Sequence, residues 1–148
     1  MTWTMARLLS AIMFCALGYY CGLLTRATFN EGVAADYFPH AIAIIGLWQG
    51  WTVLGKQVGQ GYYASLGQGF RTSVQITIFG LLFFALREMF IRSGQLRYND
   101  FGVALFDAMG LFLQYGQQFL LIYEAWMTLG LGGMVIGIVA EAAKRVWR

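Results

Sequence analysis

Long apolar runs alternate with short charged or polar stretches along the whole chain. Four runs stand out, at about residues 8–25, 38–54, 72–91 and 121–141. Each provides about 17 to 22 residues, enough at ~1.5 Å per residue for a helix to cross the ~30 Å hydrocarbon layer of a membrane. An isolated strand cannot pair its backbone polar groups in lipid, so we expect every run to be helical. The pattern predicts an all-α membrane protein, a single domain over residues 1–148 with four transmembrane helices.

A fifth segment, between the third and fourth runs, is too long for a loop and too polar to cross the bilayer. On a helix, its polar side chains project within about 20° of one line, and large apolar side chains lie opposite. This stripe contains Asp100, Asp107, Gln114 and Gln118. We expect an amphipathic helix over about residues 100–118, lying along the membrane surface with Asn99 or Asp100 as its N-cap. Two interpretations remain: the helix covers the outer end of the bundle, or its polar stripe is a docking face for a partner.

Glycine spacing suggests how the transmembrane helices pack. Three of the four predicted helices contain G-x-x-x-G, a spacing that lets helix backbones approach closely in lipid. The pairs are Gly18 and Gly22, Gly46 and Gly50, and Gly133 and Gly137. We therefore expect a compact bundle held by close helix crossings.

Composition supports a membrane protein and excludes several other classes. The chain is 59% hydrophobic and only 11% charged, whereas soluble domains average about 25% charged residues. Its net charge of +3 is scattered along the chain, which does not favour nucleic-acid binding. Cys15 and Cys21 are about 240° apart on a helix, so we expect free thiols and not a disulfide or a metal pair.

The distribution of basic residues predicts the orientation. Four crossings bring both termini to one side, which then carries six basic residues against four on the other side. The positive-inside rule places that side in the cytoplasm. We expect a multi-pass protein of the bacterial inner membrane with both termini cytoplasmic.

One stretch, Gly59-Gln60-Gly61-Tyr62-Tyr63-Ala64, has the G-x-G-x-x-A spacing of a dinucleotide-binding turn. Such a turn follows a buried strand and opens a helix in a soluble βαβ unit. Here the stretch joins two predicted membrane helices, so we expect no nucleotide. We expect turn and close-packing glycines from Gly55 to Gly69 in a short cytoplasmic connection, with Lys56 and Arg71 contacting lipid headgroups.

The sequence contains no pattern typical of a catalytic or metal site. His40 is the single histidine, and it has no cysteine or second histidine beside it to share a metal. Arg87 and Glu88 resemble an intramembrane charge pair, but adjacent residues do not share a helix face and Arg87 can reach the interface. We therefore expect no catalytic residue, no bound metal and no cofactor.

Four stretches together resemble the TrgA family of small inner-membrane proteins, known chiefly from alphaproteobacteria, phototrophs among them. They are "ARLLSAIMFCALGYY", "IAIIGLWQGWTVLGKQVGQGYYASLGQG", "LRYNDFGVALFDAMGLFLQYG" and "GLGGMVIGIVAEAAKRVWR". The resemblance implies an association with tellurite resistance, which is a phenotype and not a mechanism, and it brings no active-site residues.

These observations favour a non-catalytic accessory or assembly subunit of a larger energy-transducing membrane complex, photosynthetic or respiratory. The expected partners are membrane lipids and other integral membrane subunits, and neither nucleic acid nor nucleotide. The alternative is a small transporter or membrane-stress factor acting directly on tellurite or related oxyanions, for which Arg87 is the only plausible cation inside the bundle.

Overall fold

The computed structural model describes residues 2–26, 37–57, 59–95 and 100–146, and within these residues the chain is all-helical without strands. The helices are α1 (Thr2–Arg26), α2 (Phe38–Gln49), α4 (Tyr62–Gly94), α5 (Phe101–Leu121) and α6 (Tyr123–Val146). A π-helical segment, η1 (Gly50–Leu54), and the short α3 (Gly55–Gln57) continue α2. Three stretches, Met5–Arg26, Tyr62–Gly94 and Tyr123–Val146, are long and apolar enough to cross a membrane. These helices indicate a membrane protein.

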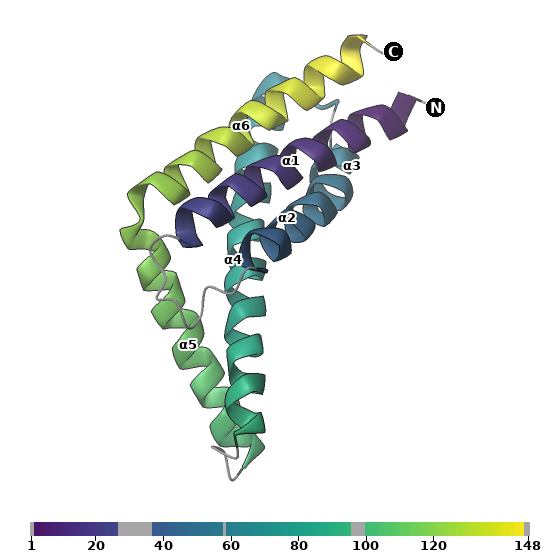
Figure 1. Ribbon diagram of the computed structural model, residues 1–148. Helices are drawn as coiled ribbons and strands as arrows, with labels where there is room; N and C mark the ends of the chain where they lie inside the picture. Colours follow the sequence, from purple (N-terminus) through teal and green to yellow (C-terminus); the bar gives the residue numbers. More distant parts are fainter. Residues whose placement is uncertain (1, 27–36, 58, 96–99, 147–148) are drawn as a thin grey trace.

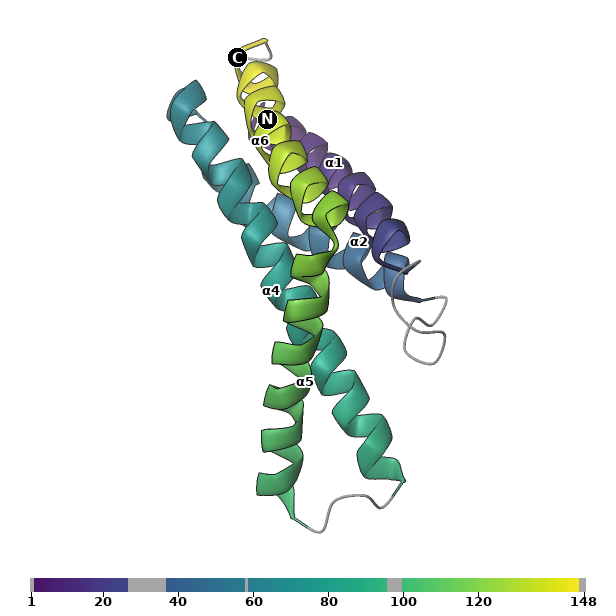
Figure 2. The ribbon, with the colours of Figure 1, turned by 90° about the vertical axis from the view of Figure 1, so that its left-hand side faces the viewer.

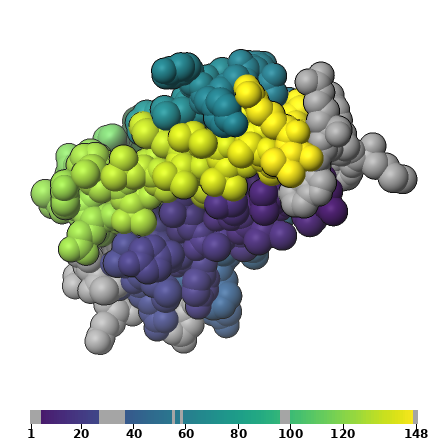
Figure 3. Space-filling model, turned by 90° about the horizontal axis from the view of Figure 1, so that it is seen from above, coloured from purple at the N-terminus to yellow at the C-terminus, as the bar shows by residue number. Residues whose placement is uncertain are grey.

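Helices α1, α2 and α6 and the first half of α4 form a bundle (Figure 1). Seen from above, α6 lies between α4 and α1, and α2 covers the far side of α1 (Figure 3). The buried core of this bundle comprises Phe14, Leu54, Ile76, Ile136 and Ala140. Side chains from α1, η1, α4 and α6 thus meet in one apolar cluster.

The second half of α4 leaves the bundle and pairs with α5 as a helical hairpin (Figure 1 and Figure 2). We call residues 82–94 and 101–121 the α4–α5 hairpin. Ala104 and Ala108 of α5 pack with Met89 of α4, and farther along Leu111 and Tyr115 pack with Ala85. The hairpin therefore has small apolar clusters of its own. At Ile122 the backbone (φ −84, ψ 78) interrupts the helix, and α6 begins in a new direction.

The helix limits differ from the predicted runs at two places. The third helix begins at Tyr62 and not near residue 72, so Gly67, Gly69 and Arg71 belong to α4 and not to a connection. Among the described glycines only Gly59 and Gly61 have positive φ, and the chain is free to be helical directly after them. The fourth predicted run is divided at Ile122, because its first residue, Leu121, ends α5.

The predicted interfacial segment, residues 100–118, falls within a single helix, α5, and its N-cap position. This helix packs lengthwise along α4 and does not lie across the outer end of the bundle (Figure 1). The face that contacts α4 contains Ala104, Ala108, Leu111 and Tyr115. Of the large apolar residues that were expected to face the membrane, Phe101, Leu105 and Met109 are exposed.

Candidate functional site

The glycines of two predicted motifs lie where α1 and α2 cross. A Cβ on Gly22 would come within 2.6 Å of the Pro39 Cα, and one on Gly50 within 2.7 Å of the Ser10 carbonyl oxygen. The Ser10 hydroxyl also donates to the Gly50 carbonyl at 3.0 Å. Gly18 and Gly46 make equally close approaches to the partner backbone. These four positions leave no room for a side chain.

The third motif lies where α6 crosses α4. A Cβ on Gly133 would come within 2.8 Å of the Gly69 carbonyl oxygen, and one on Gly137 would contact the Ser65 carbonyl. The Ser73 hydroxyl donates to the Leu129 carbonyl across the same crossing, at 2.8 Å. Small residues and an interhelical hydrogen bond are the usual means of helix association in lipid.

The G-x-G turn binds a carboxylate that belongs to the same chain. Gly59 and Gly61, with φ of +110° and +106°, precede the first turn of α4. The buried Glu141 of α6 accepts the Gly59 N–H at 2.5 Å and the Ser65 hydroxyl at 3.0 Å, both on Oε2, and the Gly61 N–H as well. Free N–H groups and the dipole at a helix N-terminus favour an anion. The anion-binding character of this spacing is real, but its anion is Glu141.

Basic residues of α6 complete this contact. The Arg145 Nε lies 3.4 Å from Glu141 Oε1, and its guanidinium lies 4.4 Å above the centre of the Tyr62 ring. The Lys144 side chain lies directly against Gly59. The end of α6 is thus fixed to the loop that begins α4. The donors of the turn point at Glu141, so the turn links α6 to the start of α4.

An ion-pair network joins the two helices of the hairpin. Arg92 of α4 contacts Glu88 Oε1 through Nε and Asp107 Oδ2 through NH1, each at 3.1 Å. Sequence reasoning missed Arg92, because only the three-dimensional pairing of α4 with α5 brings it to Asp107. The i, i+4 spacing of Glu88 and Arg92 was the one local signal.

The predicted docking stripe is divided by this network. Asp107 faces Arg92, whereas Asp100, Gln114 and Gln118 are exposed. Asp100 occupies the N-cap position of α5 with extended backbone, but its side chain makes no capping hydrogen bond. The alternative cap, Asn99, lies outside the described residues. Asp107 is therefore paired within the hairpin, and the other three residues of the stripe are accessible.

The exposed surface of the hairpin is mainly apolar. Phe101 and Phe106 are 75% and 78% exposed, and other large apolar side chains are exposed along both helices. They include Phe83, Phe90, Val103, Leu105, Met109 and Leu113. An exposed apolar surface of this extent marks a contact with lipid or with another protein.

The remaining candidates lie apart from one another. Lys56 and Arg71 are exposed on α3 and α4, and His40 is exposed at the start of α2 with its ring 5.5 Å from that of Tyr19. Arg87 lies half-buried in the hairpin part of α4. Within the described ranges, no group of three or more His, Cys, Asp or Glu residues could hold a metal ion.

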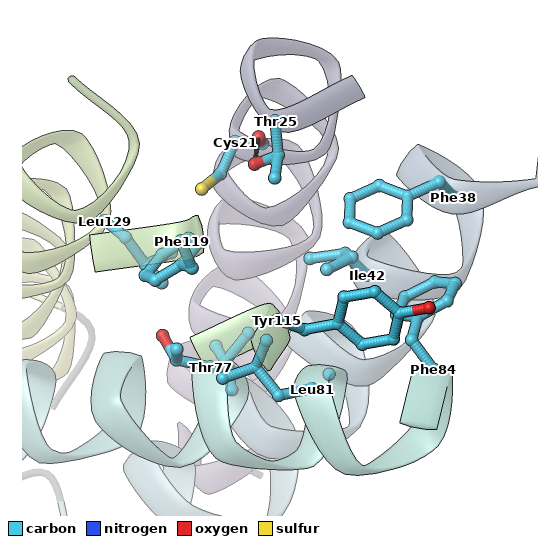
Figure 4. A pocket seen from close by; sticks show the side chains of 12 residues that line it. Cys21, Thr25, Phe38, Ile42, Thr77, Leu81, Phe84, Tyr115, Phe119 and Leu129 are labelled. Atoms are coloured by element: carbon cyan, nitrogen blue, oxygen red, sulfur yellow. Dashed lines mark hydrogen bonds between the residues drawn. The ribbon is translucent and has the colours of Figure 1, made fainter. Parts of the chain in front are cut away.

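A small apolar cavity of about 30 Å³ lies where five helices meet (Figure 4). Along one side of the cavity, the rings of Phe38 and Phe84 stack with their centres 4.3 Å apart, and Tyr115 approaches from α5. Cys21 also lines it; Cys15 and Cys21 are both free thiols, as predicted. The Thr25 hydroxyl donates to the Cys21 carbonyl at 2.6 Å, so it turns toward its own helix.

Comparison of the chain with protein-family models, with curated proteins and with solved structures gives no match. The resemblance to the TrgA family stays a prediction.

Proposed function

We propose that this protein is a non-catalytic accessory or assembly subunit of a larger membrane complex, and that it docks on an integral membrane partner through the α4–α5 hairpin. The observation that supports this proposal is the exposed apolar surface of the hairpin, which projects from the bundle (Figure 2). An energy-transducing complex of the bacterial inner membrane remains our proposal for the partner, in keeping with the resemblance to the TrgA family.

The proposed topology has four crossings and cytoplasmic termini. Besides the three long helices, residues 38–57 are continuously helical and would extend about 30 Å, the thickness of the hydrocarbon layer. The start of α1 and the end of α6 lie at the same end of the bundle (Figure 1). Lys144 and Arg145 lie at that end, beside the loop that begins α4, which agrees with a cytoplasmic location.

The length of α4 is the reason for invoking a protein partner and not lipid alone. Its 33 residues extend about 50 Å, and even a tilt of about 40° leaves about 38 Å along the membrane normal, more than the ~30 Å hydrocarbon layer. In the proposed topology the start of α4 lies at the cytoplasmic surface beside Lys144 and Arg145, so the far end of the hairpin would emerge from the lipid. Phe101 and Phe106, near that end, would then face water unless another protein covers them.

The charges of the hairpin are consistent with an apolar contact. Arg92 is neutralised within the hairpin by Glu88 and Asp107, so a partner needs no countercharge for it. The alternative function, direct action on oxyanions, requires a cation inside the bundle. Arg87 lies on the hairpin, which gives that alternative less support.

Site-specific cross-linking tests the docking surface. A photoreactive phenylalanine analogue at Phe106, 78% exposed, should cross-link an integral membrane polypeptide in intact membranes. The matched control is the same analogue at Tyr63, 95% exposed at the other end of α4, which should not capture that polypeptide. Phe106→Glu should also abolish co-purification in mild detergent while the chain stays in the membrane. Recovery of free monomer or homodimer alone, with no cross-link from Phe106, would refute the proposal.

A further inference from the structure

A second hollow, on the outer face of α4, α5 and α6, adjoins the cavity at the five-helix junction. It has a volume of about 290 Å³ and shares four lining residues with that cavity, namely Thr77, Leu81, Phe119 and Leu129. The hollow exists because α5 and α6 meet at an angle at Ile122 while α4 continues past them (Figure 1 and Figure 2). We call this hollow the α4–α6 groove.

The lining of the groove suits hydrocarbon. Its walls carry exposed apolar side chains, among them Phe70, Leu120 and Trp126. Two hydroxyl-bearing residues line it, and both hydroxyls are already used: Ser73 donates to the Leu129 carbonyl at 2.8 Å and Thr77 to the Ser73 carbonyl at 3.1 Å. A polar ligand would lose its hydrogen bonds to water here without replacement, which is costly.

Two glycines contribute to the open space of the groove. A Cβ on Gly116 would meet only Leu81 Cδ1, at 3.8 Å, and one on Gly130 only the Phe70 ring, at 3.6 Å. These are ordinary contacts, unlike the backbone clash that a Cβ would make at Gly69. Glycine inside a helix is less stable than alanine by about 0.5–1 kcal/mol. At Gly116 and Gly130, neither helix packing nor backbone conformation requires it.

We propose that the α4–α6 groove binds one hydrocarbon chain of a membrane phospholipid, which enters from the lipid-facing side and points toward the five-helix junction. The groove lies against α4 and α6, two of the three stretches able to cross a membrane, so acyl chains surround its opening. Its volume, about 290 Å³, is roughly twice the ~150 Å³ of an apolar cavity that binds benzene. The proposal does not depend on the docking role of the hairpin.

The test uses the full chain, purified in detergent and delipidated, with dibromostearoyl phosphatidylcholine as the probe. Native mass spectrometry counts retained lipid, and bromine quenching of Trp126, taken as the difference from Trp126→Phe, reports its position in the groove. Each buried methylene contributes about fourfold in affinity. Gly116→Leu, which displaces two or three methylenes, should weaken binding about fifteen- to sixtyfold. Gly110→Leu, on the same helix with open space around it, should bind as the wild type.

Gly130→Leu, on α6, repeats the test from the opposite wall in case Gly116→Leu fails to fold. Saturable quenching of Trp126 at one lipid per chain, lost in either filled variant, supports the proposal. Unchanged binding in both filled variants overturns it, and so does wild-type protein in which the quenching of Trp126 does not saturate. Wild-type protein that retains an isoprenoid quinone from its native membrane in place of phospholipid overturns the choice of ligand.

Discussion

Replacing Glu141 by alanine should detach the end of α6 from the loop that begins α4. The carboxylate accepts hydrogen bonds from Gly59, Gly61 and Ser65. A hydrogen bond to a charged group contributes about 1.5–3 kcal/mol. In the alanine variant, water can replace the carboxylate as the acceptor for the exposed Gly59 N–H. The Ser65 hydroxyl is buried and would be left without an acceptor. We therefore expect a loss of about 2–4 kcal/mol in the free energy of unfolding, from the Ser65 hydrogen bond together with the smaller contribution of the contacts that water can replace.

Glu141→Gln separates the effect of charge from that of shape. Glutamine keeps one acceptor oxygen in the same place, and a neutral acceptor makes hydrogen bonds about half as strong as a charged one. We expect this variant to lose about 1–2 kcal/mol. Glu124→Ala is the matched control, because Glu124 lies exposed in the first turn of the same helix. Its interaction with the helix dipole is worth about 0.3–1 kcal/mol.

Thermal unfolding in detergent, followed by circular dichroism, measures all three variants. At about 2–4 °C per kcal/mol for a chain of this size, the midpoint should fall by about 4–16 °C for Glu141→Ala. The expected fall is about 2–8 °C for Glu141→Gln and at most about 4 °C for Glu124→Ala. Equal midpoints for Glu141→Ala and Glu124→Ala would refute the reasoning, because they would mean that the carboxylate does not hold the loop.

Two further predictions concern the helix crossings and the hairpin. Gly69→Val should greatly reduce the yield of monodisperse protein in size-exclusion chromatography, because its side chain would meet the α6 backbone. The control Gly67→Val, with open space around it, should keep the wild-type yield, because valine has a higher helix propensity than glycine. Arg92→Met should destabilise the α4–α5 hairpin by about 1 kcal/mol, since its ion pairs are partly exposed. Backbone hydrogen exchange should accelerate in residues 82–94 and 101–121 of Arg92→Met but not of Arg71→Met. High salt should reduce the difference in exchange rate between Arg92→Met and the wild type, because salt screens the ion pairs.

The helical class and the membrane environment follow directly from the spacing of apolar runs, and three of the runs correspond to helices able to cross a membrane. The start of α4 could not be predicted in the same way. Residues 62–71 contain Gly67 and Gly69, and glycine inside a helix costs about 1 kcal/mol relative to alanine. This local signal indicates a connection. The helix forms because Gly69 lets α4 pack directly on the α6 backbone, a tertiary contact that no local pattern contains.

The contact between Glu141 and Gly59 illustrates the same limit for the site. The G-x-G spacing is visible in the sequence, and its capacity to bind an anion is a property of the backbone. The anion comes from a residue 82 positions later. A local pattern therefore predicts the anion-binding turn but not the anion that it binds. No signal in the sequence indicates that Glu141 would occupy this turn.

For α5, periodicity predicts a helix with one polar stripe but does not determine which face packs. The large apolar residues suggest a face turned toward the membrane, yet Ala104 and Ala108 make the contact with α4. Small residues allow the two helices to approach closely, and this approach brings Arg92 to Asp107. The packed face is determined by the partner helix, which the pattern of one helix considered alone does not show.

The glycines of this chain fall into two groups according to what an added side chain would contact. In one group the side chain would meet a neighbouring helix backbone, and in the other it would find open space. At Gly22, Gly50 and Gly69 a Cβ would overlap the backbone of another helix, so glycine is needed for the helices to cross. At Gly116 and Gly130 a Cβ would make ordinary contacts only, so glycine there lowers helix propensity without enabling a crossing. A sequence cannot distinguish these two groups, since both occur in apolar helices. A structure can, and the second group lines the groove that we propose to hold a hydrocarbon chain.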